Sequence, residues 1–199
     1  MVQSLENLFE TPSQTAGPYV HLGCIPTFAG HPDIYGKDVG QSPIEDGAQG
    51  TLIEISGSVY DGLGWALRDA MIESWQADAN GRFAGQDGAD PKVPGFCRFA
   101  ADQQTGAFTL RTIKPGKVPI RGGGFQAPHI SLWIVGRGIN IGLNTRLYFE
   151  DEDNTRDPLL SRIEQKTRIA TLIAKPDGDG KYRFDIHLKG SDETVFLDL

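Results

Sequence analysis

Residues 112–149, TIKPGKVPIRGGGFQAPHISLWIVGRGINIGLNTRLYF, carry the clearest structural signal in this sequence. They begin with a turn-rich run of prolines and glycines and then enter Pro128–Val135, a β-branched and aromatic segment that predicts a strand. Side chains two residues apart on a strand share a face, so His129 and Ser131 point the same way. Two histidines at this spacing would form a metal-binding pair on a rigid strand, but only the first position holds one.

Segments of strand composition recur on both sides of this stretch, separated by turns rich in glycine, proline, asparagine and aspartate. We predict the strands Leu52–Tyr60, Ala70–Gln76, Cys97–Phe99, Ala107–Ile113 and Asn144–Phe149. Short strands at this spacing are typical of a sandwich, and 25 glycines and 12 prolines favour such a turn-rich fold over a helix bundle. The predicted fold class is therefore mainly β, an antiparallel β-sandwich with a short helix and long loops.

The C-terminal part of the sequence adds a helix, a further strand and a hairpin. Asp157–Ile163 predicts the helix, with Asp157 as its N-cap and a proline at its first position. Thr167–Lys175 could continue as helix or start a strand, and a strand from Ile169 is the expectation. Alternating apolar residues in Lys181–Leu188 and Thr194–Leu199 predict the two arms of a C-terminal β-hairpin.

Charge and composition exclude several classes of function. The chain has 19 basic and 26 acidic residues and a net charge of -7, which argues against a nucleic-acid partner because phosphates are bound through basic surface. No apolar run approaches the roughly 18–20 residues that cross a bilayer, so no membrane partner is expected. The N-terminal residues have no basic and apolar signal region, and two cysteines make no disulfide framework. We therefore expect a cytoplasmic protein.

Longer segments spread over nearly the whole chain carry a further signal: TPSQTAGPY (11–19), VYDG (59–62), ESWQADANGRF (73–83), TIKPG (112–116), APHIS (127–131), RLYF (146–149) and the C-terminal pieces YRFDI and VFLDL. In these segments and in their order, the chain resembles the intradiol ring-cleaving dioxygenases. The resemblance implies the β-sandwich fold of that family and a mononuclear non-haem ferric ion, Fe(III), held by two tyrosinates and by two histidines spaced H-x-H on one strand.

By this resemblance, the four ligand positions of the family fall on Phe83, Val118, His129 and Ser131. Phenylalanine and valine cannot supply a phenolate, and a serine hydroxyl is a poor ferric ligand, so three of the four positions lack the donor. One remaining imidazole cannot hold Fe(III) against water. The resemblance therefore implies a degenerate site without a metal in this chain, as in the α subunit of the two-subunit members, and a partner β subunit that binds the Fe(III).

Other matched residues imply a contribution to the active site of that β subunit. Carried over by motif, Thr15, Gly17 and Pro18 would line the pocket of the aromatic substrate, protocatechuate, with Tyr19 next to them. Arg137 matches an arginine near the pocket entrance, where its charge would attract and orient the carboxylate of the substrate. The pair would use O₂ to cleave protocatechuate to 3-carboxy-cis,cis-muconate, a step of aromatic catabolism in the β-ketoadipate pathway.

The expected organisation has two parts. Residues 1–50 show no periodic pattern of apolar residues that would form a core. We expect them to form an N-terminal extended strap and loops that pack on the partner subunit, and residues 51–199 to form the dioxygenase-like β-sandwich domain. Thr15–Pro18 could instead serve only as an interface strap, Arg137 as a surface arginine and His129 as a buried, hydrogen-bonded relic. For the whole chain, the alternative is a non-catalytic β-sandwich binding or structural module with a degenerate metal site.

Overall fold

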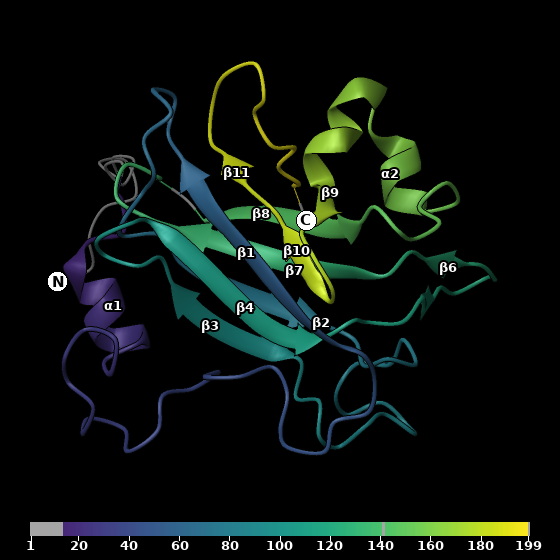
Figure 1. Cartoon of the computed structure of the whole chain (residues 1–199), viewed down its shortest axis with the longest axis horizontal. Helices are drawn as coiled ribbons and strands as arrows, with labels where there is room; N and C mark the ends of the chain where they lie inside the picture. Colours follow the sequence, from purple (N-terminus) through teal and green to yellow (C-terminus); the bar gives the residue numbers. More distant parts are fainter. Residues whose placement is uncertain (1–13, 141, 199) are drawn as a thin grey trace, which may run out of the picture.

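The computed structural model describes residues 14–140 and 142–198; the expectations for residues 1–13 lie outside this range. Its strands stack in two layers, with α1 near one end and α2 near the other (Figure 1). None of the helices in the described ranges has the length and apolar character needed to cross a membrane. The helices are α1 (Pro18–Cys24), α2 (Pro158–Arg162) and the 3₁₀ helix η2 (Lys166–Leu172), and the strands are β1 (Leu52–Tyr60), β2 (Met71–Gln76), β3 (Phe96–Ala100), β4 (Ala107–Ile113), β5 (Val118–Pro119), β6 (Phe125–Gln126), β7 (His129–Val135), β8 (Leu143–Phe149), β9 (Ile173–Pro176), β10 (Lys181–Arg183) and β11 (Ile186–His187).

One layer of the sandwich is antiparallel, in the order β3, β2, β7 and β8. The other is centred on β1, which pairs with β4 in an antiparallel manner and with β10 and β11 in parallel. Strand β9 joins the layers because it pairs with both β8 and β10. The predicted mainly β sandwich is confirmed, with the difference that three pairs of strands, β1–β10, β1–β11 and β8–β9, are parallel.

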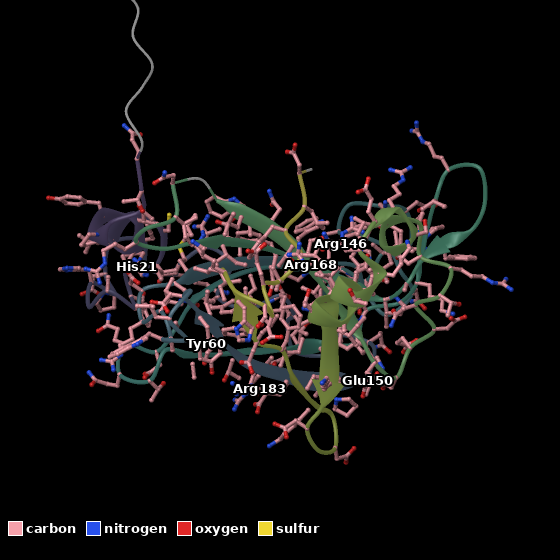
Figure 2. All side chains as sticks on the ribbon, turned by 90° about the horizontal axis from the view of Figure 1, so that it is seen from above. His21, Tyr60, Arg146, Glu150, Arg168 and Arg183 are labelled. Carbon is pink, nitrogen blue, oxygen red and sulfur yellow. The ribbon has the colours of Figure 1, made fainter. Side chains whose placement is uncertain are left out.

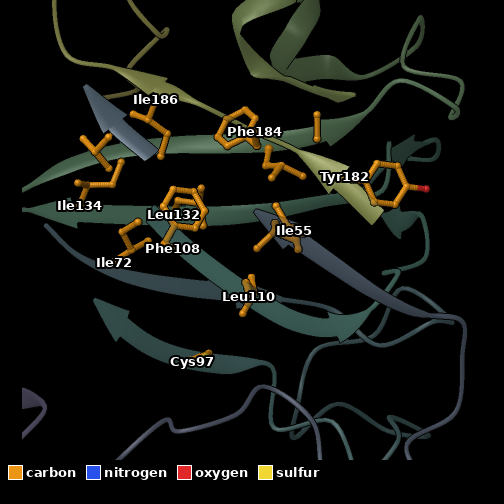
Figure 3. Close-up of a cluster of buried hydrophobic side chains, with 14 of the residues drawn as sticks. Ile55, Ile72, Cys97, Phe108, Leu110, Leu132, Ile134, Tyr182, Phe184 and Ile186 are labelled. Atoms are coloured by element: carbon orange, nitrogen blue, oxygen red, sulfur yellow. The ribbon is translucent and has the colours of Figure 1, made fainter. Parts of the chain in front are cut away.

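The main core lies between the layers, where the inward side chains of the facing strands meet (Figure 3). On β7, the side chains of Ile130, Leu132 and Ile134 are buried in this core. Because side chains alternate along a strand, His129 and Ser131 lie on the outer face of the layer. The core therefore fixes the direction in which the two predicted ligand positions point.

Helices cover this outer face at two separate places. Where β7 begins, Leu160 of α2 and Leu172, the last residue of η2, form a small buried cluster with Tyr148 of β8. Where β7 ends, Val20 of α1 packs into a cluster that contains Val135. The two ends of β7 therefore have different surroundings on the same face of the sheet.

The predicted strands between residues 52 and 149 are confirmed, each with its ends within one residue. The predicted helix is also confirmed: Asp157 accepts hydrogen bonds from the backbone N–H groups of Leu159 (2.9 Å) and Leu160 (3.1 Å), as an N-cap residue does. Helix α1, in contrast, has no counterpart in the prediction, which expected an extended segment around Pro18.

The strand expected from Ile169 is wrong, because Ile169 lies in η2 and β9 begins only at Ile173. Ile169 and Leu172 are three residues apart, which brings both to the same side of a 3₁₀ helix. Both belong to the cluster that covers β8. Packing against the outer face of the sheet thus overrides the β-branched composition of this segment.

The prediction of a C-terminal hairpin is also wrong, since β10 and β11 both pair with β1 and not with the residues after Thr194. The residues after Thr194 instead contribute an isolated bridge between Leu197 and Asn144. Alternation correctly predicts burial of Tyr182, Phe184 and Ile186. It does not predict which strand becomes the neighbour, because that choice depends on residues far away in the sequence.

Candidate functional site

The side chain of Thr15 holds the segment before α1 against the turn that follows β7. Its Oγ1 accepts a hydrogen bond from the backbone N–H of Gly138 (2.8 Å) and donates one to the carbonyl oxygen of Gly136 (3.2 Å). These two glycines flank Arg137. Thr15, more than a hundred residues away in the sequence, therefore fixes the turn that carries the arginine.

A cavity of about 1070 Å³ lies between α1, this turn and the loop of residues 61–69. Gly17, the N-cap of α1, and Pro18, its first residue, contribute to its wall together with Arg137. The structure thus brings four of the five predicted pocket residues to one place, with Thr15 behind the wall. Tyr19 does not line the cavity and is 85% exposed. Apolar side chains complete much of the lining, among them Phe28, Trp65, Leu67, Ile139 and Leu188.

The cavity contains charged and titratable groups that sequence reasoning missed. The side chain of Arg137 is 80% exposed, and its Nε lies 3.5 Å from Oδ2 of Asp69. His21 follows Gly17 by four residues, so the two share a side of α1. Burial lowers the pKa of His21 below its ordinary 6.5, although the negative charge of Asp69 acts in the opposite direction. The ring is therefore neutral at pH 7. Helical spacing would have indicated His21 had α1 been predicted, whereas no sequence signal points to Asp69.

The degenerate ligand positions lie at the other end of β7, where Trp75 links two of them. The ring of Phe83 stacks on that of Trp75, with centroids 5.9 Å apart and planes 1° from parallel. Trp75 pairs with Ser131 across β2 and β7. Val118 is buried in β5, opposite Gln126 of β6. Phe83 and Val118 therefore contribute packing at two positions where the resemblance predicts oxygen donors.

His129 is 3% exposed and has the contacts of a buried structural histidine. Its Nδ1 lies 2.8 Å from the carbonyl oxygen of Ala127, and because a carbonyl only accepts, Nδ1 carries the proton of the ring. Burial and the nearby positive charge of Arg146 lower the pKa of His129 to about 4, so the ring is neutral at pH 7. Its centroid is 5.7 Å from that of Tyr148.

The residues at these positions do not fit a ferric ion. The side chains of Phe83 and Val118 contain neither nitrogen nor oxygen, and His129 alone keeps an imidazole. A ferric site needs several anionic or imidazole donors around one point. Within residues 14–140 and 142–198, no three His, Cys, Asp or Glu side chains gather where they could hold a metal ion.

Known proteins resemble this chain over most of its length. The family model described as Dioxygenase matches residues 26–190. The protocatechuate 3,4-dioxygenase alpha chain of Pseudomonas putida is 46% identical over 199 residues, 98% of each chain. The protocatechuate 3,4-dioxygenase beta chain of Burkholderia cepacia is 30% identical over 172 residues, 79% of this chain and 73% of that one.

Solved structures agree with these sequence relationships. The dioxygenase domain of a carbohydrate-binding fusion protein from Streptomyces sp. SirexAA-E superimposes with a TM-score of 0.57 and 26% identity, over 78% of this chain and 88% of that one. The 3-chlorocatechol 1,2-dioxygenase of Rhodococcus opacus 1CP shares the fold, with a TM-score of 0.58 and 23% identity over 74% of this chain and 64% of that one. The chain therefore belongs to the intradiol dioxygenase family.

Proposed function

We propose that this chain is the α subunit of a protocatechuate 3,4-dioxygenase and shapes the substrate pocket of a β subunit that binds Fe(III). Similarity to the Pseudomonas putida alpha chain over 98% of both chains supports the proposal. The assembled enzyme uses O₂ to cleave protocatechuate between its hydroxylated carbons and gives 3-carboxy-cis,cis-muconate. This chain contributes binding and orientation of the substrate.

The observation that carries the proposal is the separation of the cavity from the degenerate site. His129 opens β7, and Arg137 follows its last residue, Val135. At about 3.3 Å per residue, β7 alone spans roughly 20 Å. Figure 1 shows α1 and α2 at opposite ends of the molecule, and Figure 2 shows His21 and Arg146 well apart in a second view. Residues around the cavity therefore cannot act at the degenerate site of their own chain, and they need an active site from another chain.

The groups around the cavity suit an aromatic carboxylate. Apolar side chains such as Trp65 favour an aromatic ring, and Arg137 offers a planar guanidinium that matches a carboxylate. Its pair with Asp69 is long and mostly exposed, so it stabilises the chain little and can be exchanged for a carboxylate of the substrate. Arg137 thus binds and orients the substrate through its charge.

Gly17 supports a close approach from outside the chain. Its φ of -124° is open to any residue, and apart from its two chain neighbours an added Cβ would meet no atom of the described residues within 4 Å. Within the part of the chain that the structure describes, neither the backbone nor the packing requires glycine here. We therefore propose that Gly17 leaves room for a neighbour, either the substrate or the β subunit.

Exposed apolar side chains around the cavity support docking of the β subunit at this end of the molecule. Tyr19 and Phe28 on one side, and Leu63 and Trp65 on the other, are all exposed. Monomeric proteins rarely leave large apolar groups together on their surface. In this proposal, Tyr19 contacts the β subunit and does not line the pocket.

The proposal keeps the predicted division of the chain into a strap of residues 1–50 and a sandwich domain of residues 51–199. Part of the first segment also contacts its own chain, since Val20 and Ile25 pack in a cluster with Val135. A cytoplasmic location belongs to the same proposal. The free thiols of Cys24 and Cys97 are in keeping with a reducing compartment.

The test is to express this chain alone, its β chain alone and the two together, and to measure iron content and protocatechuate-dependent O₂ uptake. We expect full activity only in the pair. If this chain alone binds one iron and turns over, the ligand assignment is wrong. If the two chains form no complex, a non-catalytic β-sandwich module becomes the better interpretation.

Within the pair, Arg137→Ala tests the pocket assignment. Loss of a charged hydrogen bond to the carboxylate should raise KM for protocatechuate about tenfold or more, with iron content unchanged. Arg111→Ala is a matched control, because the Arg111 side chain is 82% exposed and forms an ion pair with Glu54 (2.9 Å). An unchanged KM in Arg137→Ala, or an equal rise in both variants, would remove Arg137 from the pocket.

A further inference from the structure

Arg146 lies among the four degenerate ligand positions. The register of β7 and β8 places it beside Ser131. Its Nη1 donates a 2.6 Å hydrogen bond to Oε1 of Gln126, which pairs with Val118 across β5 and β6. Its charge also contributes to the lowered pKa of His129. The cationic side chain of Arg146 thus lies close to the segments that hold three of the four positions, namely Ser131, Val118 and His129.

The counter-charge of this region is the carboxylate of Asp157, which is 1% exposed. It accepts hydrogen bonds from the backbone N–H of Ala127 (2.8 Å) and from the Tyr148 hydroxyl (3.2 Å). Arg146 and Asp157 act in opposite directions on the pKa values of both His129 and Tyr148, so both charges lie near the same two rings. The region already holds one positive and one negative charge of the chain itself.

Arg146 adds a hydrogen-bonding group of the wrong polarity for a metal ion. The Nε–H of Arg146 is buried and has no acceptor among the described residues. An N–H donor needs an acceptor such as a water oxygen, whereas a metal ion needs donors of lone pairs. Nδ1 of His129 carries the proton that faces Ala127, so the only lone pair of this ring is on Nε2.

We infer that Arg146 takes the place of the ferric ion as the positive charge of this region and keeps metal ions out of it. A metal ion beside Ser131 would lie close to a guanidinium held by Gln126, and like charges repel strongly away from bulk water. Restoring lost donors is therefore insufficient for metal binding while Arg146 remains. The inference concerns this chain alone and does not depend on its pairing with a β subunit.

A histidine pair on β7 provides the test. Ser131→His restores the H-x-H spacing with His129, and Ni²⁺ is the probe because imidazoles bind it well. Calorimetric titration of the full chain compares S131H, S131H with R146Q, and S131H with R168Q. Arg168 is a matched control, since its guanidinium is held by Glu193 (3.0 Å) and not by Gln126, and its loss changes the net charge equally. The wild-type chain measures Ni²⁺ bound elsewhere.

We expect the Kd for Ni²⁺ to be at least about tenfold lower in S131H with R146Q than in the other two variants. Equal Kd values with and without Arg146, or no binding in any variant, would overturn the inference. Circular dichroism and thermal unfolding establish that each variant is folded. Should R146Q not fold, Arg146→Met removes the charge with a similar apolar stem, and Arg146→Lys keeps the charge and should bind as weakly as S131H.

Discussion

Replacement of Asp157 by alanine should destabilise this chain strongly, because one buried carboxylate satisfies four donors. It caps α2 through the backbone N–H groups of Leu159 and Leu160, and it also accepts from Ala127 N–H and the Tyr148 hydroxyl. Loss of an N-cap costs about 1 kcal/mol. A buried donor left without an acceptor costs about 1–3 kcal/mol. With two such donors, Asp157→Ala should lower the free energy of unfolding by about 4 kcal/mol.

Urea unfolding followed by circular dichroism measures this difference, and thermal unfolding should show a decrease in Tm of roughly 8–16 °C for a chain of this length. Asp153→Ala is the matched control, since Asp153 is exposed in the preceding loop and accepts its hydrogen bonds from the neighbouring Thr155. It should leave unfolding unchanged. A loss below about 1 kcal/mol in Asp157→Ala would mean that water replaces the carboxylate, and the reasoning on buried donors would fail.

Three further predictions concern pH dependence and the cavity. His129 has a pKa of about 4 in the folded chain, below the ordinary 6.5, so the free energy of unfolding should be about 2 kcal/mol lower at pH 5 than at pH 7. His129→Gln should remove this difference, whereas the control His31→Gln, at an exposed position, should keep it. Against the effect of burial, hydrogen bonds from Lys114 and Tyr182 lower the pKa of Asp151. The stability lost in Lys114→Met should therefore be largest at neutral pH and shrink as the pH falls below about 4, measured by urea unfolding across that range. Gly17→Leu should leave the Tm of this chain unchanged and reduce O₂ uptake by the assembled pair. Equal O₂ uptake by the variant and wild-type pairs would show that nothing approaches Gly17 closely.

Local patterns predicted the strands because each one buries alternate side chains in a single core. Ile130, Leu132 and Ile134 show this on β7, and the aspartate and proline that start α2 predicted that helix by their capping chemistry. The partner of a strand is a different matter. Tyr182 and Ile186 are buried as predicted, yet their strands pair with β1, more than a hundred residues earlier in the sequence.

The candidate site divides in the same way between local and distant information. Motif matches placed Thr15 and Arg137 in one pocket, and the hydrogen bonds of Thr15 to Gly136 and Gly138 give a physical reason for their proximity. The sequence could not place Asp69 in that cavity, because only the fold brings its loop there. The sequence analysis expected an extended segment around Gly17 and so missed α1. The apolar residues of this helix are buried only by packing against the end of β7, which the sequence does not reveal.

The length of β7 makes the two ends of its outer face energetically independent. Substitutions more than about 10 Å apart that share no partner have additive effects, and β7 separates its ends by roughly twice that distance. Thr15 holds the turn around Arg137 at one end, while Asp157 and Arg146 fill the other end. Donor atoms can therefore be lost at the start of β7 without disturbing the pocket wall beyond its end. Accordingly, Asp157→Ala should lower Tm and leave KM unchanged, whereas Arg137→Ala should raise KM and leave Tm unchanged. A change of both quantities in either variant would mean that the strand couples its two ends.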